Sequence, residues 1–277
     1  MATPIRNEPP AAACDTASTR PWKFDRGDGP VVAAAIHSGH DVRPDVAEWL
    51  ALSDADRLRE EDPLTGLWTS VGDSFIQVFR SRFEVDLNRP RETAIAANDG
   101  ENWGLTIWRR SPPEHVVERS LAEYDRFYRE LRRFVDALTA QWHGVLVLDL
   151  HSYNHRRAGP DEPAESLVGN PEINIGTGTM KRERWARLIE CFTAALRNQA
   201  FDGRPLDVRE NVKFKGRHFP EWLHGHYPEQ VCVLSLELKK FFMDEWRGTA
   251  DIAALEQLRV ALENATNAVR PELARIR

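Results

Sequence analysis

Val145-Leu-Val-Leu-Asp-Leu-His-Ser-Tyr-Asn-His-Arg-Arg157 decides the fold, because an apolar run ends there abruptly in charged and polar side chains. Four or five apolar residues between Gly144 and a polar cluster predict a central strand that is buried on both faces, as in α/β sheets. Ligands bind outside the carboxyl ends of the strands in such sheets. His151 is therefore a candidate for chemistry, although a histidine that only caps the strand would give the same pattern.

Asp149 precedes His151 by two positions, so the two side chains share one face of the predicted strand. In that position Asp149 could orient the imidazole of a metal ligand. The alternative is a buried aspartate that caps a neighbouring loop.

A second apolar run ends in the same way, because Val31–Ile36 is followed at once by His37-Ser-Gly-His40. The acidic cluster Glu60-Glu61-Asp62 follows in sequence, and a third apolar run, Val231–Leu238, carries Glu237 near its end. Two imidazoles and a carboxylate, with one position left open for water, form a recurring catalytic zinc set. The strand ends therefore predict a hydrolytic metal site.

Such a site needs a second carboxylate that is not a metal ligand. Zinc lowers the pKa of its water to about 7 and polarises a carbonyl. A separate general base then takes the proton of the water and delivers it to the leaving amine. Glu237 is the candidate, since an acid at the end of an apolar strand is costly unless it is paired or functional.

Composition excludes several other classes of protein. The net charge of −6 comes with no basic tail or stripe, so no nucleic-acid partner is expected. The three scattered cysteines indicate neither a disulfide framework nor a cysteine-based zinc site. No apolar run approaches the roughly 18 residues that span a membrane, and the N-terminus has no apolar segment typical of a secretory signal. We therefore expect a cytoplasmic protein without a membrane partner.

The remaining patterns alternate between strands and helices. We expect helices at 44–59, 113–142, 181–198 and 251–276, strands at 74–80, 173–175 and 208–214, an extended segment at 82–90, and loops at 91–113 and 215–219. This alternation predicts an α/β three-layer sandwich with a mixed, largely parallel central sheet. We expect one domain at 29–277 after a flexible lead-in at 1–28.

Several of these segments together resemble the N-formylglutamate amidohydrolase (deformylase) family. They are His37-Ser-Gly39, Glu61-Asp62, Ser81–Pro90, Asp149-Leu-His-Ser152, Asn174-Ile-Gly-Thr177, Phe214-Lys-Gly-Arg-His218 and Glu237-Leu238. The resemblance runs from about residue 30 to 248, and a more distant one extends to zinc carboxypeptidases. It implies a phosphorylase/hydrolase-like fold, one zinc ion and hydrolysis of an amide next to a free carboxylate. For N-formylglutamate the products would be formate and glutamate.

The resemblance also assigns roles to individual residues. His37, Asp62 and His151 would hold the metal, with Glu61 and His40 as rivals of Asp62. Iron, cobalt or manganese would also suit such ligands.

The other roles concern the substrate, a small N-acyl amino acid. Glu237 would act as general base and then acid, and His218 would polarise the carbonyl or steady the oxyanion. Asn88, Arg89 and Arg156 would bind the substrate carboxylate, because a guanidinium binds carboxylates bidentately.

Two other functions fit the same residues. One is a carboxypeptidase-like hydrolase of a peptide or a larger amide conjugate. The other is a binding protein that keeps the pocket without metal, which stoichiometric metal in the purified protein would exclude. The sequence predicts no oligomeric state.

Overall fold

The computed structural model describes residues 20–97 and 104–276. Within them a seven-stranded sheet has the order β1-β3-β2-β4-β9-β5-β8. Its strands are β1 (Trp22–Asp25), β2 (Val31–Ala35), β3 (Ser74–Val78), β4 (Val145–Tyr153), β5 (Ile173–Gly176), β8 (Val208–Glu210) and β9 (Val231–Lys239). The strands β3, β2, β4 and β9 are mutually parallel, whereas β1 and β5 run antiparallel to their neighbours β3 and β9. The predicted mixed, largely parallel sheet is confirmed.

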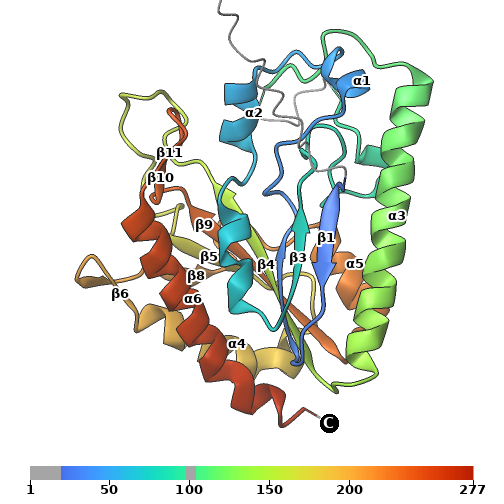
Figure 1. The fold of residues 1–277 in the computed structure, drawn as a ribbon. Coiled ribbons are helices and arrows are strands. Elements are labelled where there is room, and N and C mark those ends of the chain that lie inside the picture. Colours follow the sequence, from blue (N-terminus) through green and yellow to red (C-terminus); the bar gives the residue numbers. More distant parts are fainter. Residues whose placement is uncertain (1–19, 98–103, 277) are drawn as a thin grey trace, which may run out of the picture.

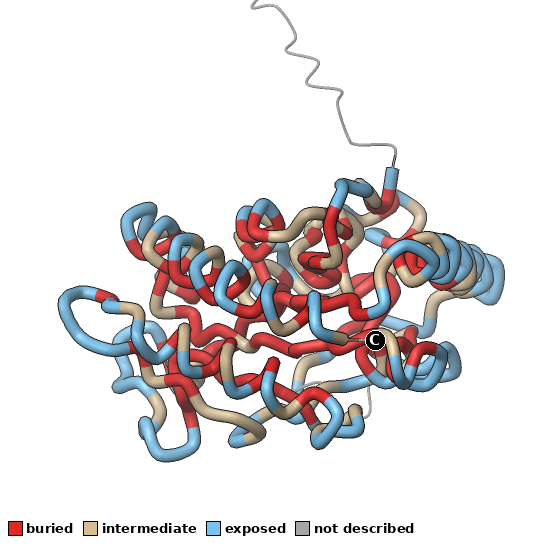
Figure 2. The backbone as a smooth tube through the Cα atoms, turned by 90° about the horizontal axis from the view of Figure 1, so that it is seen from below, coloured by how far each residue is buried: buried red, intermediate tan, exposed pale blue. Residues whose placement is uncertain are grey.

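Helices cover both faces of this sheet (Figure 1). The described helical segments are α1 (Pro44–Ala47), α2 (Asp54–Glu60), η1 (Thr65–Val71), η2 (Arg91–Thr93), α3 (Glu114–Thr139), α4 (Arg182–Arg197), α5 (His218–His226) and α6 (Ile252–Leu273). The helices α3 and α5 pack on one face, and α4 and α6 pack on the other. Figure 2 shows the sheet as a buried layer between helices whose outer sides are exposed. The predicted three-layer sandwich is therefore confirmed.

Side-chain alternation in β4 builds both cores. Leu146, Leu148 and Leu150 join the cluster under α4 and α6, whereas Val145 and Val147 join the cluster under α3 and α5. Because successive side chains of a strand point to opposite faces, Asp149 and His151 follow Val145 and Val147 on the face that α3 and α5 cover. The α3 and α5 face thus changes from apolar to polar toward the carboxyl end of β4.

Several segments differ from the expectations. The strand predicted at 208–214 ends at Glu210, and the helix predicted at 44–59 is divided into α1 and α2. The predicted lead-in at 1–28 contains β1, whose Trp22 is 7% exposed and packs in the core; residues 1–19 lie outside the described range. The segment at 82–90 forms turns and is not extended. The predicted loop at 215–219 leads directly into α5, which is too short for its helical period to stand out in the sequence.

The remaining described strands form two small hairpins, β6 (Ala200–Phe201) with β7 (Arg204–Pro205) and β10 (Met243–Asp244) with β11 (Thr249–Ala250). The second hairpin stands above the end of β9, close to the segment that follows β4 (Figure 1). Among the described helices, none has the length and apolar character that crossing a membrane requires.

Candidate metal centre and catalytic cavity

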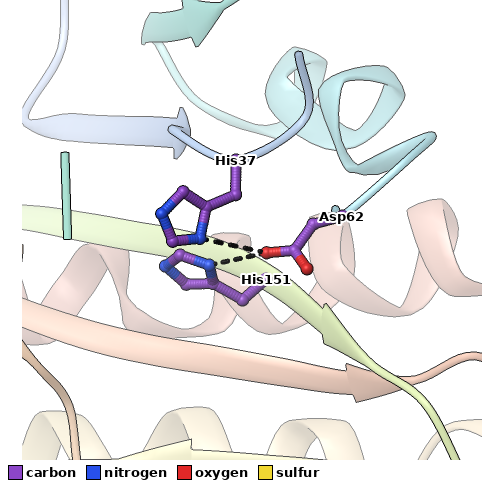
Figure 3. A group of neighbouring side chains, drawn as sticks. All are labelled: His37, Asp62 and His151. Atoms are coloured by element: carbon purple, nitrogen blue, oxygen red, sulfur yellow. Dashed lines mark hydrogen bonds and ion pairs between the residues drawn. The ribbon is translucent and has the colours of Figure 1, made fainter. Parts of the chain in front are cut away.

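Three buried side chains converge at the carboxyl ends of the parallel strands. His37 lies two residues after the end of β2, His151 lies in β4, and Asp62 follows α2. The backbone N–H of Asp62 donates to the carbonyl of His37 at 3.0 Å, which ties the end of α2 to the end of β2. All three residues are buried, and Figure 3 shows both imidazoles turned toward the Asp62 carboxylate.

The facing atoms form a set suited to a divalent metal. His151 Nδ1 lies 2.8 Å and His37 Nδ1 lies 3.5 Å from the same oxygen of Asp62. One ligand atom from each residue falls within 4.8 Å of the others. His37 Nδ1 is buried, yet it makes no hydrogen bond with any described residue. Two nitrogens and one carboxylate oxygen directed at one point match a three-ligand catalytic site.

Two further aspartates face the other nitrogen of each imidazole. Asp86 Oδ1 lies 2.7 Å from His37 Nε2, and Asp149 Oδ1 lies 2.9 Å from His151 Nε2. A carboxylate at this position fixes the tautomer and the orientation of a metal-binding histidine. With the proton on Nε2, each Nδ1 presents its lone pair to the centre. Asp149 therefore lies where the sequence predicts an orienting partner of His151, and Asp86 has the equivalent position beside His37.

The ionisation of these groups follows from their neighbours. Burial opposes the charge of Asp62, but its contacts with His151 and His37 outweigh burial and hold the pKa well below the usual value. For Asp86, burial is likewise outweighed by the charges of Arg82 and His37, so the pKa is again well below the usual value. The centre therefore keeps anionic carboxylates at neutral pH.

Glu237 lies beside the centre on β9. It is the cross-strand partner of His151, and its half-buried side chain reaches the cavity in front of His37, Asp62 and His151. Burial raises the pKa of this carboxyl to about 7, and the charge of Asp62 adds to the effect. A carboxyl with a pKa near neutrality can both accept and return a proton.

Two adjoining cavities open in front of these residues, one of about 300 Å³ and one of about 140 Å³. Both are lined by a shared set of residues, namely Asn88, His151, Lys213, Phe214, Arg217 and Glu237. Only the larger cavity reaches Arg82, Arg157 and Lys240. The open space therefore extends in two directions from His151 and Glu237.

Asn174 fixes one wall of these cavities. Its side-chain oxygen accepts hydrogen bonds from the backbone N–H groups of Val212 and Lys213, and its amide donates to the carbonyl of Phe214 at 2.7 Å. These contacts pin the segment that carries Lys213 and Phe214 into the cavity lining. Asn174 belongs to the Asn174–Thr177 segment, one of those that carry the family resemblance, and these hydrogen bonds give it a structural role beside the cavities.

Of the substrate-binding pair predicted at Asn88 and Arg89, only Asn88 lines the cavities. Asn88 lines both cavities, its Nδ2 lies 3.5 Å from His151 Nε2, and its side-chain oxygen accepts from the Phe219 N–H. Arg89 lines neither cavity, and its Nε lies 3.4 Å from Asp86. Arg89 thus contacts the same carboxylate that faces His37.

Two predicted residues lie elsewhere. Arg156 lines a separate open depression beside β10 and β11, and its guanidinium donates to the carbonyl of Pro160. Its neighbour Arg157 lines the larger cavity instead. His218, at the start of α5, lies 3.0 Å from the Tyr124 hydroxyl and lines neither cavity. The geometry therefore does not support a carboxylate clamp at Arg156 or an oxyanion role for His218.

The rivals of Asp62 are engaged with each other. His40 Nδ1 lies 2.5 Å from Glu61 Oε2, and the other oxygen of Glu61 accepts from the Ser81 hydroxyl. Neither residue belongs to the group of candidate ligands found in the described part of the chain. Of the three alternatives, Asp62 is the carboxylate that meets both imidazoles.

The sequence did not single out Asp86, Arg82 or Lys240, and of the neighbours Arg156 and Arg157 it favoured Arg156. The signal for Asp86 was present, since it stands in the Asp-Leu-Asn-Arg-Pro run, but a turn rather than a strand orients its side chain. Arg82 donates to Asp86 at 2.8 Å. Arg157 and Lys240 are placed by long-range contacts, which no local pattern reveals.

The fold and site define an α/β protein with a buried group, His37, Asp62 and His151, that could hold a metal ion. A sequence model of the N-formylglutamate amidohydrolase family matches residues 29–243. The chain therefore belongs to the N-formylglutamate amidohydrolase family.

Solved structures agree with this fold. The crystal structure of an N-formylglutamate amidohydrolase from Ralstonia eutropha JMP134 superimposes with a TM-score of 0.70 and 19% identity, covering 92% of this chain and 98% of the other. A gene product from Agrobacterium tumefaciens gives a TM-score of 0.63 and 17% identity, with 90% and 96% of the two chains covered. The search of curated proteins returned no match.

Proposed function

We propose that this protein is a metal-dependent amidohydrolase that cleaves an N-formyl, or other small N-acyl, amino acid such as N-formylglutamate. The observation that carries the proposal is the buried centre of His37, Asp62 and His151, with Glu237 beside it in a chain of this family. A divalent ion, which we propose to be zinc, would polarise the amide carbonyl and acidify a water there.

Glu237 is the proposed proton carrier of the reaction. Its carboxylate would accept a proton from the attacking water and return it to the amide nitrogen as the C–N bond breaks. The products are then formate, or another small carboxylate, and a free amino acid. The pKa of about 7 suits both steps near neutral pH.

Asp86 and Asn88 would prepare the site for the substrate. Asp86 accepts from the backbone N–H of Asn88 at 2.8 Å and also faces His37 Nε2. One carboxylate would thus position both the proposed metal ligand His37 and Asn88, which lines the cavities. Asn88 can then donate its amide to a carboxylate or carbonyl oxygen of the substrate.

The test combines metal analysis with a comparison of substrates. Protein purified without chelator should contain about one equivalent of zinc or another divalent ion, and it should release formate from N-formylglutamate. Chelation should abolish the activity, and adding the metal back should restore it. Protein that binds no metal would support the metal-free binding function, and faster cleavage of short peptides would support the carboxypeptidase-like alternative.

A further inference from the structure

Lys240 is a buried cation at the larger cavity that the proposed chemistry does not use. It directly follows β9, three residues after Glu237, and its backbone N–H donates to the carbonyl of Tyr153. The residue is 1% exposed, yet its side chain lines the cavity.

The ammonium group is only partly satisfied. It donates to the backbone carbonyls of Arg59 at 2.6 Å and Glu61 at 2.7 Å. An ammonium carries three N–H donors, so one remains beyond these two bonds. No described carboxylate lies within ion-pair distance of Lys240 Nζ. The two half-buried arginines of the cavity lining show the contrast, because each has an acidic partner: Arg82 pairs with Asp86, and Arg157 pairs with Glu60.

A buried ammonium without a carboxylate is costly, because burial removes its hydration and two neutral carbonyls replace only part of it. Burial lowers the pKa of Lys240 to about 8, although the nearby charges of Asp62, Glu60 and Glu245 oppose this shift. Glu60 lies on the same wall of the cavity, but Arg59 and Arg157 already engage it. An anion that entered the cavity would therefore find an N–H donor of the Lys240 ammonium that no carboxylate occupies.

We propose that Lys240 binds a carboxylate of the substrate and so helps to select acyl amino acids by their charge. This inference rests on the proposed function and assigns a specificity-determining residue to it. Lys240 also supports the backbone just before Asp62, so loss of activity in a Lys240 variant is not sufficient evidence. The test must separate charge recognition from support of the metal centre.

The experiment compares three substrates in the metal-loaded enzyme, N-formylglutamate, N-formylglutamine and N-formylisoglutamine. The two amides each lack one carboxylate. Lys240→Met should lower kcat/KM for N-formylglutamate by about 10- to 100-fold, the loss expected for one charge-assisted hydrogen bond. For the amide that lacks the bound carboxylate, the loss should be several-fold smaller. Lys240→Gln, which keeps a donor for the two carbonyls without the charge, should show the same difference between substrates.

Lys239→Met is the matched control, since Lys239 is also buried, at 5% exposed, but does not line the cavity. It should leave the ratio of the three kcat/KM values unchanged. Equal losses on all three substrates in both Lys240 variants would overturn the inference and reduce Lys240 to a support for the 59–62 segment.

Calorimetric binding of the same three compounds keeps the inference testable if no turnover occurs. Affinity that depends on Lys240 only when the carboxylate is present would uphold the inference while the proposed function fails. Affinity that is the same in wild type and Lys240→Met would overturn the inference.

Discussion

Asp86→Asn tests whether the carboxylates behind the imidazoles tune the metal centre. The substitution keeps the shape of the side chain but removes the charge that faces His37 Nε2 at 2.7 Å and Arg82 Nη2 at 2.8 Å. Outer partners of this kind typically contribute 10- to 100-fold to metal affinity, or about 1.4–2.7 kcal/mol. We therefore expect the Kd for Zn²⁺ to rise by a factor in that range.

Competition with a chromophoric chelator measures this Kd directly. Asp125→Asn is the control, because Asp125 pairs with Arg91 at the surface and lines neither cavity. Asp149→Asn, which changes the carboxylate behind His151, should raise the Kd by a similar factor and serves as a second variant if Asp86→Asn folds poorly. Zinc affinity equal to wild type in folded Asp86→Asn and Asp149→Asn would refute the orienting role.

Two further predictions concern the cavity wall and the fold. Arg157→Ala should raise KM for N-formylglutamate in steady-state kinetics, because Arg157 lines the larger cavity. Arg156→Ala should leave KM near the wild-type value, because Arg156 lines a separate depression. A larger effect on KM at Arg156 than at Arg157 would contradict this placement. Burial lowers the pKa of His224 from 6.5 to about 4, and its Nε2 accepts from the Val233 N–H. The unfolded chain then binds the proton more readily, so the stability that neutral His224 provides is lost as the pH falls below about 6.5, by about 2 kcal/mol at pH 5. Urea unfolding should show this loss in wild type and not in His224→Gln; equal pH profiles would contradict it.

Much of the fold could be predicted because the inner strands are apolar runs with abrupt polar ends. The runs at Val31–Ile36, Val145–Leu150 and Val231–Leu238 became β2, β4 and β9, and the long amphipathic helices also formed where expected. Because the three strands are parallel, their carboxyl ends meet at one edge of the sheet. This topology explains why residues distant in sequence, such as His37 and His151, could be placed in one site.

Turns and long-range contacts set the parts that sequence could not predict. Arg156 and Arg157 are neighbours, but only Arg157 lines the larger cavity. Glu245 holds the backbone beside them by accepting from the N–H groups of His155 and Arg156. The Trp246 side chain adds a hydrogen bond to the carbonyl of Arg156. Nothing local in the 154–157 segment encodes these contacts with a chain region about 90 residues away.

The same limit applies to the orientation of the ligands. Asp86 faces His37 because the segment after β3 turns back across the end of β2, whereas the sequence pattern favoured an extended chain there. The α3 tyrosine Tyr128 fixes that turn by donating to the carbonyl of Leu87 at 2.6 Å. The orientation of the Asp86 side chain therefore depends on tertiary packing and not on the local sequence.

The central claim is that the centre beside Glu237 hydrolyses an N-acyl amino acid, and formate release by Glu237→Gln tests it most directly. Wild type and variant should contain the same amount of metal, measured in the same samples. We predict that the variant loses about 10²- to 10⁴-fold in kcat on N-formylglutamate, the usual contribution of a general acid–base group. A variant with full metal content and a near-native rate would contradict the claim.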